Sequence, residues 1–432
     1  MQTPGRDATL PQWLAWLETL HPKKIDLSLN RIRTVLEVLG LEQPPFVCIT
    51  VGGTNGKGSC VAYLSQIYRR AGLRTGAFTS PHLIDFNERI AVDGVPASDA
   101  ELVAAFEEMN AARDEITLSY FEASAVAALI CFARRRVEIA VLEVGMGGRL
   151  DAVNAIDADA ALIVSVGLDH EEWLGNDRES IGFEKAGIMR SARPAVIADP
   201  QPPASVATTA QHIGADVLFI GKDFDVAEHG DALRIRCRSG ATCDVPRPGF
   251  GGAEQWLNVA ASVQIVECLA GRVPVPEAAV RQGIAAAAPA GRGDIRMLDD
   301  VEWVLDVAHN PAAAERLVAM LATRPAAART WAVFGALTDK DIVGVLNQFA
   351  QFVDGWFCVD VHADRGALSS DVAKVLAQAR SDADISGFAD VAAACSAVRN
   401  RATAGDRIVV FGSFHVVGPA LSVLELYCEP PG

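Results

Sequence analysis

Residues 46–59 read Phe-Val-Cys-Ile-Thr-Val-Gly-Gly-Thr-Asn-Gly-Lys-Gly-Ser, and this stretch decides the fold. Its start, residues 46–51, is apolar or β-branched and predicts a short buried strand. The glycine-rich part follows, and residues 59–71 predict a helix that ends at Gly72. A strand, a glycine-rich turn and a helix in this order can cradle phosphate, because backbone N–H groups and the helix N-terminus attract an anion.

The turn departs from the strict phosphate-loop pattern G-x-x-x-x-G-K-[ST]. Val51 occupies its first position, and Gly58 separates Lys57 from Ser59. The flanking strand and helix nevertheless favour a phosphate loop in which Lys57 reaches the β- and γ-phosphates of ATP. A glycine-rich turn with an incidental lysine is the alternative. The expected ATP-binding residues of the loop are Thr54, Asn55, Gly56, Lys57, Gly58 and Ser59.

Outward from this loop, apolar segments of strand length alternate with helix-length segments, which predicts parallel α/β units. The linker-like segment Pro289-Ala-Gly-Arg-Gly293 interrupts the pattern, so we expect one domain over residues 1–293 and a second over 294–432. The predicted strands are residues 75–78, 137–144, 160–166 and 194–198 before the linker, and 303–307, 330–334, 356–361 and 407–411 after it.

Composition excludes several classes of protein. The chain has 432 residues, half of them hydrophobic, and a net charge of −16 from 54 Asp and Glu against 38 Lys and Arg. Such an acidic chain is a poor ligand for nucleic acid or for an anionic membrane. The nine cysteines form no C-x-x-C pair, which suits a reducing compartment. With no signal-peptide pattern and no apolar run near the ~20 residues of a membrane span, we expect a cytoplasmic protein.

Six further motifs follow the phosphate loop in a fixed order. They are Thr79-Ser-Pro-His-Leu83, Leu142-Glu-Val-Gly-Met-Gly-Gly-Arg-Leu-Asp-Ala-Val-Asn154, Asp169-His170, Glu184-Lys-Ala-Gly-Ile188, Asp306-Val-Ala-His-Asn-Pro311 and Gly412-Ser-Phe-His415. Together with the loop they resemble the folylpolyglutamate synthase/dihydrofolate synthase family, a branch of the Mur ligase superfamily, over residues 26–418. The resemblance implies an α/β fold in which a P-loop ATPase-type parallel-sheet domain precedes a smaller Rossmann-like α/β domain.

Three residues at predicted strand ends are candidate metal ligands: Ser80, Glu143 and His170. Open α/β sheets place their sites at such ends, and an enzyme that acts on the γ-phosphate of ATP needs Mg²⁺. The resemblance implies that these side chains bind one or two Mg²⁺ ions, with K⁺ as a further candidate cofactor. Taken singly, each has a structural alternative: a turn before proline, a helix cap and a core histidine.

The predicted second domain supplies a strand-to-helix turn that contains Asp306 and His309, with Asn310-Pro311 as the expected helix start. Helix capping alone would also explain this turn. By resemblance, Asn258, Arg292 and Asp306 contact ATP, and His309 lies beside the transferred phosphoryl group. Arg292, in the linker, would clamp phosphate when the domains close, although a solvated linker arginine is the alternative. A weaker assignment places Ser413 and His415 on the glutamate or phosphate side.

The resemblance also implies a pterin or folate site and a modified lysine. Ordinary core packing would explain Tyr120 and Phe121 equally well, and residues 24–30 could be a surface loop. Lys185, at the expected start of a helix, would carry a carbamate; the alternatives are a solvated helix face and an ion pair with Glu184. The candidate pterin or folate residues are Asp26, Leu27, Ser28, Leu29, Ser119, Tyr120, Phe121, Glu122, Leu150 and Asp151.

The leading functional hypothesis is an ATP-dependent amide ligase. Its catalytic residues would be Lys57, His309, Lys185 and Arg292. It would join L-glutamate to dihydropteroate and to reduced folates through an acyl phosphate, acting on small molecules only and as a monomer. The alternatives are a folylpolyglutamate synthase with one activity, another Mur-type amino-acid ligase, a P-loop small-molecule kinase and a non-catalytic nucleotide-binding module.

Overall fold

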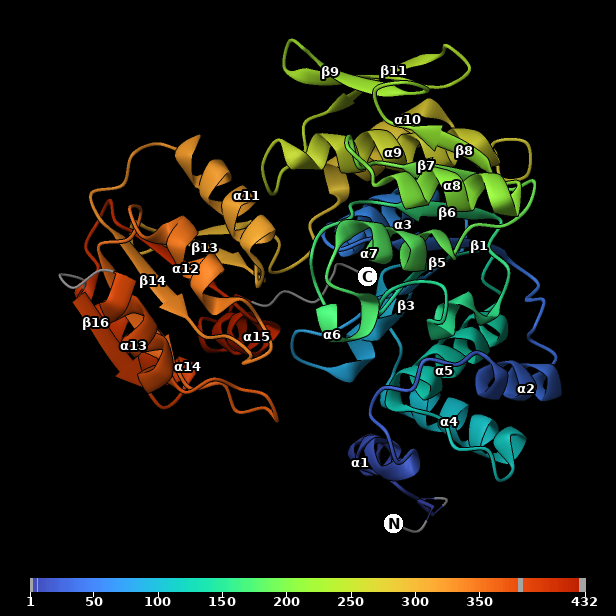
Figure 1. Cartoon of the computed structure of the whole chain (residues 1–432), viewed down its shortest axis with the longest axis horizontal. Helices are drawn as coiled ribbons and strands as arrows, with labels where there is room; N and C mark the ends of the chain where they lie inside the picture. The colour runs from blue at the N-terminus through green and yellow to red at the C-terminus, as the bar shows by residue number, and fades with distance from the viewer. Residues whose placement is uncertain (1–2, 6, 380–383, 427–432) are drawn as a thin grey trace.

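The computed structural model describes residues 3–5, 7–379 and 384–426. Two separate β-sheets, each covered by helices on both faces, account for most of the chain. Figure 1 shows the second sheet and its helices, in orange and red, beside the larger part drawn from blue to yellow. This arrangement is the α/β architecture expected from the alternating pattern.

The first sheet has the strand order β4-β3-β2-β5-β1-β6-β7-β8. Only β3, near one edge, runs opposite to the other strands, and it pairs antiparallel with both β2 and β4. Its central strand β1 is buried on both faces, with Ile49 packed on one side and Cys48 on the other, which explains the uninterrupted apolar run. The strands are β1 (Val47–Gly52), β2 (Thr75–Phe78), β3 (Ile90–Val92), β4 (Val95–Pro96), β5 (Ile139–Glu143), β6 (Ala160–Ile163), β7 (Pro194–Ile197) and β8 (Asp216–Phe219).

Helices cover both faces of this sheet. On one face lie α3 (Lys57–Arg70), α9 (Glu254–Leu269) and α10 (Glu277–Ala286). The opposite face is covered by α1 (Leu10–Leu20), α2 (Asn30–Leu39), α4 (Asp99–Arg113), α5 (Tyr120–Arg134), α7 (Arg178–Ala186) and α8 (Ala204–Ile213). Three short helices lie in the connections: η1 (Phe86–Arg89), η2 (Ala152–Ala155) and α6 (Glu171–Leu174).

A small antiparallel sheet was not predicted from the sequence. It consists of β9 (Asp225–His229), β10 (Ala232–Arg236) and β11 (Thr242–Pro246), and Figure 1 shows it beyond α9 and α10. Leu233 and Ile235 alternate with exposed arginines along β10, so only one face of the sheet is buried. The prediction looked for the continuous apolar runs of parallel strands, and a half-exposed antiparallel meander lacks such runs.

The second sheet has the order β12-β13-β17-β14-β15-β16, and only β12 is antiparallel. Its strands are β12 (Asp294–Leu298), β13 (Val301–Asp306), β14 (Thr330–Phe334), β15 (Gly355–Val359), β16 (Asp384–Phe388) and β17 (Arg407–Phe411). One face packs against α11 (Pro311–Ala322), α12 (Ile342–Phe349) and α13 (Ser369–Ala379), the other against α14 (Val391–Arg401) and α15 (Phe414–Val423).

The strand order brings the candidate site residues together. In the first sheet β2, β5, β1 and β6 are neighbours and parallel, so Ser80, Glu143, the phosphate loop and His170 all follow strands at one edge. In the second sheet β13, β17 and β14 are neighbours, so the turns after Asp306 and Phe411 also share an edge. This convergence at carboxyl ends is typical of ligand sites in open α/β sheets.

Candidate active site

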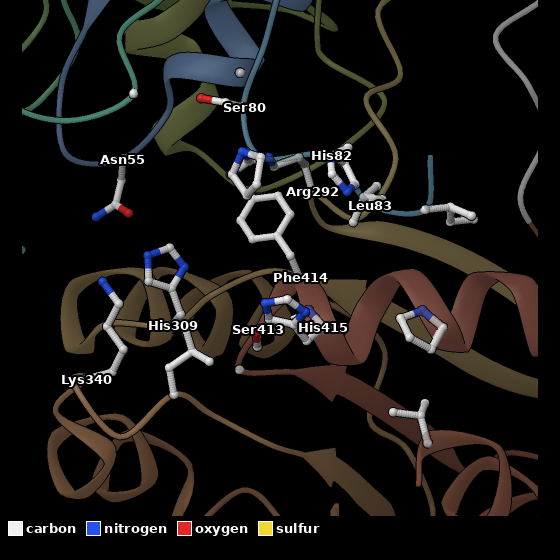
Figure 2. A pocket seen from close by; sticks show the side chains of 18 of the residues that line it. Asn55, Ser80, His82, Leu83, Arg292, His309, Lys340, Ser413, Phe414 and His415 are labelled. Atoms are coloured by element: carbon white, nitrogen blue, oxygen red, sulfur yellow. Dashed lines mark hydrogen bonds between the residues drawn. The ribbon is translucent and has the colours of Figure 1, made fainter. Parts of the chain in front are cut away.

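A cavity of about 750 Å³ separates the carboxyl edges of the two sheets. Figure 2 shows Asn55, Ser80 and His82 on one side of it, and His309, Lys340 and Ser413 on the other. A second cavity of about 380 Å³ shares Asn55, Gly56, Arg292 and His309 with the first. The predicted residues in the larger cavity are Thr54, Asn55, Gly56, Lys57, Gly58, Ser80, Glu143, His170, Arg292, His309, Ser413 and His415. Those in the smaller one are Asn55, Gly56, Ser59, Asn258, Arg292, Asp306 and His309.

The phosphate loop needs glycine for both conformation and space. Gly56 caps α3 with φ of 89°, and a Cβ there would lie 2.7 Å from a methyl carbon of Val164. Helix α3 begins at Lys57, two residues earlier than predicted. The Lys57 Nζ donates to the carbonyl oxygens of Gly53 at 3.0 Å and Thr54 at 3.4 Å. Burial lowers the pKa of Lys57, while the charge of Glu143 opposes that change.

Glu143 and His170 supply the strongest metal-ligating chemistry of the cavity. The Glu143 side chain is buried, and among the described residues its one hydrogen bond is a long one of 3.3 Å from the Ser80 N–H. Burial raises the pKa of this carboxyl, and the charges of Lys57 and Arg292 counteract the increase. Burial lowers the pKa of His170 to about 4, which keeps the imidazole neutral, as a metal ligand must be.

No group of three or more His, Cys, Asp or Glu side chains suited to a metal is found within the described ranges. A carboxylate, an imidazole and the Ser80 hydroxyl are nevertheless a fitting partial set for a hard cation, because Mg²⁺ usually completes its shell with water and substrate phosphate. The sparsely hydrogen-bonded Glu143 carboxylate leaves lone pairs for such an ion. The residues present therefore fit a divalent metal that binds together with a nucleotide.

Contacts across the cavity join the two halves of the chain. The Asn55 and Asn310 side chains exchange two hydrogen bonds of 3.2 Å, although 255 positions separate them. Arg292 lies against the ring of Phe414 with 5.4 Å from Cζ to the centroid. Its guanidinium also lies over the loop, since a Cβ on Gly58 would be 3.1 Å from Nη2. Arg292 is thus placed to touch a phosphate held by the loop.

The turn after β13 has the predicted form. Asn310 caps α11 by accepting from the Ala313 N–H, and Pro311 is the first helical residue. Asp306 is buried in the smaller cavity and accepts from the Gly293 and Ala308 N–H groups. Burial raises its pKa to about 6, against the opposing charge of Arg292. Helix capping therefore accounts for the role of Asn310, whereas Asp306 also lines the smaller cavity.

An interdomain ion pair that the sequence prediction missed lies beside the candidate metal ligands. Asp169 accepts from the Lys340 Nζ at 2.6 Å, and both side chains are about 10% exposed. His309 lies 3.6 Å from the same carboxylate. Although burial opposes it, the His309 hydrogen bond and the charges of His170 and Lys340 hold the pKa of Asp169 well below its usual range. Asp169 belongs to the motif Asp169-His170, but nothing in the sequence distinguishes Lys340 from other lysines.

On the glutamate side, Ser413 and His415 line the larger cavity at the start of α15. The Ser413 hydroxyl caps this helix by accepting from the His415 N–H at 3.2 Å. Burial lowers the pKa of His415. Their placement across from Ser80 leaves both side chains available to a ligand in the cavity (Figure 2).

The candidate pterin residues line neither cavity. Arg31 links two of their segments through ion pairs of 3.1 Å with both Asp26 and Glu122. Ser119 and Glu122 form the capping box of α5, a structural role that the spacing alone would also have predicted. These contacts bring the early segment, residues 26–29, next to the start of α5.

The remaining candidates of this group are buried or half-buried. Phe121 packs against Phe78, with ring centroids 5.6 Å apart. Leu150 is half-buried. Asp151 accepts from the Met146 N–H, and burial raises its pKa to about 7. Leu27, Ser28 and Leu29 form the connection before α2 and are half-buried or buried.

Lys185 lies in the last turn of α7, so the expectation that it begins a helix was wrong. The ion pair with Glu184 is also excluded, because Glu184 pairs with Arg149 at 2.8 Å. Lys185 is 4% exposed and, among the described side chains, forms no ion pair. Burial, with the nearby charge of Lys57, lowers its pKa to about 7. It lines neither cavity, and the charge of Asp169 opposes the lowering of its pKa.

Two family models match long segments of the chain, and known relatives match nearly all of it. The Mur ligase middle domain matches residues 51–242, and the Mur ligase glutamate ligase domain matches residues 291–414. The dihydrofolate synthase/folylpolyglutamate synthase of Escherichia coli is 38% identical over 98% of this chain and 97% of its own. The enzyme of the same name from Haemophilus influenzae is 34% identical over 96% and 98%.

Solved structures agree with these relatives. The structure of E. coli FolC in complex with DHPP and ADP superposes with a TM-score of 0.92 at 38% identity, covering 98% of this chain and 99% of that one. A bifunctional folylpolyglutamate synthase/dihydrofolate synthase with Mn, AMPPNP and L-glutamate bound gives a TM-score of 0.90 at 37% identity, covering 98% and 100%.

The phosphate loop, the two facing sheets and the Mur-type domains define an ATP-dependent ligase that joins an acid to an amino acid. Within that class, the chain belongs to the dihydrofolate synthase/folylpolyglutamate synthase family. Within the described residues, no helix is long and apolar enough to cross a membrane.

Proposed function

We propose that this protein joins L-glutamate to dihydropteroate and to the γ-carboxylate of reduced folates, through an acyl phosphate made from ATP. The observation that carries the proposal is the cavity in which a phosphate loop, Glu143 and His170 face His309 and Ser413. Relatives named for both activities, which this chain matches over nearly its full length, support the bifunctional form over a single activity.

In this proposal the nucleotide spans both cavities. Its base and ribose occupy the smaller cavity near Asn258 and Asp306, and its phosphates lie on the shared loop. Lys57 and Arg292 bind the β- and γ-phosphates and stabilise the charge that develops during phosphoryl transfer. A divalent metal held by Ser80, Glu143 and His170, for which we propose Mg²⁺, would neutralise phosphate charge when bound. K⁺ remains a further proposal.

The acceptor carboxylate attacks the γ-phosphoryl group, and ADP leaves. The amine of L-glutamate then attacks the acyl carbon, phosphate leaves, and the amide forms with loss of one proton from nitrogen. Ser413 and His415 bind glutamate on the second-domain side, and His309 lies beside the transferred phosphoryl group. We place the pterin ring against the segments that contain Asp26 and Tyr120, deeper than the cavity itself.

The domain division at residues 293 and 294, the monomeric state and a cytoplasmic location are part of the same proposal. The described cysteines are all free thiols, which supports a reducing compartment. A P-loop kinase would not need the second sheet, whose turns supply half of the cavity lining.

One assay tests the function. ADP release is measured with dihydropteroate or tetrahydrofolate, each with and without L-glutamate, and the products are resolved by chromatography. We expect sustained ADP release only with glutamate, and a glutamylated product from each acceptor. Glutamate-independent ADP release with a phosphorylated product would instead identify a kinase, and turnover of only one acceptor would identify a monofunctional enzyme.

A further inference from the structure

A buried arginine without a carboxylate partner lies in the wall of the larger cavity. Arg89, the last residue of η1, is 9% exposed and lines the cavity. Over the part of the chain that the structure describes, its side chain forms no ion pair, and the one hydrogen bond of the guanidinium runs from Nε to the His82 Nδ1 at 2.8 Å. The two terminal nitrogens have no hydrogen-bond partner among the described residues and are not fully enclosed, and the residue belongs to the cavity lining.

Two aromatic rings beside Arg89 stabilise its positive charge, but neither of them carries a negative charge that would pair with it. The guanidinium carbon lies 5.6 Å from the ring centroid of Phe86 and 5.5 Å from that of Tyr120. The neighbouring acid, Glu88, is committed elsewhere, since its two oxygens accept the N–H groups of residues 83–85 at 2.8 Å. Glu143 acts on this guanidinium only through its charge and forms no ion pair with it among the described residues. Because a buried guanidinium without a carboxylate in contact is costly, an anion from outside the chain would be bound strongly here.

His82 adds a second donor of fixed direction. An arginine Nε–H can only donate, so the His82 Nδ1 must accept, and the proton of the neutral ring resides on Nε2. His82 also lines the cavity, and Figure 2 shows it on the side opposite Ser413 and His415. The His82 Nε2–H and the Arg89 terminal N–H groups therefore form a donor pair on the first-domain wall.

We propose that Arg89 and His82 bind the carboxylate of the acceptor, the group that is activated as acyl phosphate. The planar fork of arginine matches a carboxylate in a bidentate geometry. Tyr120, which packs on Arg89, belongs to a segment assigned above to the pterin ring, so one end of the acceptor lies there already. The incoming glutamate has its own candidates, Ser413 and His415, on the other domain. This inference rests on the proposed function and adds its carboxylate subsite.

The test compares dihydropteroate with its carboxamide analogue, which has the same shape but lacks the negative charge. Binding to the ADP- and Mg²⁺-loaded enzyme is measured by calorimetry without glutamate. We expect the wild type to prefer the carboxylate by about 10–100-fold, the range of charge-assisted hydrogen bonds. Arg89→Gln should lose that preference while carboxamide binding stays within about threefold. Arg89→Lys, which keeps the charge but not the fork, should retain part of it.

A matched control is Arg247→Gln. Arg247 also stacks on an aromatic ring, with 5.7 Å from its Cζ to the Trp256 centroid, but lines neither cavity. It should keep the full preference and the wild-type melting temperature. In turnover, Arg89→Gln should raise KM for dihydropteroate about 10–100-fold, with KM for ATP and for glutamate changed less than about threefold.

Three results would overturn the assignment. Equal weakening of carboxylate and carboxamide would show that Arg89 only shapes the pocket. A rise confined to KM for glutamate would place the amino-acid carboxylate at Arg89, and a loss confined to ADP or inorganic phosphate binding would place a phosphate there. The proposed function fails separately, if the wild type releases no ADP with either acceptor and glutamate. A carboxylate preference abolished by Arg89→Gln would still support the subsite in that case.

Discussion

Lys185 offers the sharpest test of the catalytic site, because its environment predicts a chemical modification. The side chain is buried in the last turn of α7, its neighbour Glu184 is paired with Arg149, and its pKa is lowered to about 7. At pH 7 about half of such amines are neutral, compared with roughly 1 in 3,000 for a lysine of ordinary pKa. Only the neutral amine attacks CO₂, so we expect a carbamate here, formed with release of one proton.

The carbamate would replace a buried cation by an anion with two oxygens, which a nearby divalent metal stabilises. The direction of the pKa change sets the pH dependence. At constant dissolved CO₂, the rate of carbamate formation should rise up to about pH 7 and level off above it, whereas an exposed lysine continues to gain reactivity to about pH 10. The site is thus expected to be modified under neutral conditions.

The assay uses Lys185→Ala and CO₂ depletion. We expect Lys185→Ala to lose about 100-fold or more of its glutamate-dependent ADP release, with partial recovery when a short carboxylic acid fills the vacated space. The wild type, held in CO₂-free buffer at mildly acidic pH, should lose activity, regain it with bicarbonate, and gain the mass of one CO₂. Lys222→Ala, at an exposed position, is the matched control and should change nothing. Wild-type activity of Lys185→Ala, or an unmodified Lys185 in a well-ordered metal-bound crystal structure, would refute the reasoning.

Three further predictions concern the cavity. Lys57→Ala removes a charge from the phosphate loop and should lower turnover by about 10²–10³-fold with an unchanged melting curve; near-normal ADP release would exclude the assigned role. Glu143→Ala or His170→Ala should raise the Mg²⁺ concentration needed for half-maximal activity, whereas a purely structural role would lower the melting temperature at unchanged Mg²⁺ demand. Lys340→Met and Asp169→Asn should each weaken turnover, and their double-mutant cycle should give a coupling of about 1–3 kcal/mol, since both partners are mostly buried; additive effects would show that the interdomain pair is dispensable.

The sequence predicted the central strands well because burial on both faces leaves long apolar runs. Thr330–Phe334 and Arg407–Phe411 match β14 and β17 to the residue. The predicted segment 137–144 is longer than β5 by two residues at its start and one at its end, because the buried Val137 and Val144 flank the strand. The sheet formed by β9, β10 and β11 was missed, since half of its residues face solvent.

At the site, the loop and the strand-end residues were predictable, because one physical rule places the carboxyl ends of parallel strands together. Lys340 and Arg89 were not. The importance of Lys340 follows only from its contact with Asp169, which lies 171 positions away in the sequence. Arg89 is informative only because its neighbours leave it without a counter-ion, a property of packing and not of spacing.

Part of the cavity wall groups three cations around one buried carboxylate, although the chain as a whole is acidic. The net charge of −16 excludes polyanionic partners along the surface, yet Lys57, Arg292 and Arg89 all act on the buried Glu143 carboxylate and favour its ionised form. Among the described residues, none of these three cations forms an ion pair with Glu143, so each can still pair with a bound anion. A group of three cations that form no ion pair among the described residues, beside one buried carboxylate, favours ligands that carry several negative charges in a small space. ATP together with two carboxylate substrates meets that requirement, whereas a neutral acceptor would leave Arg89 unpaired.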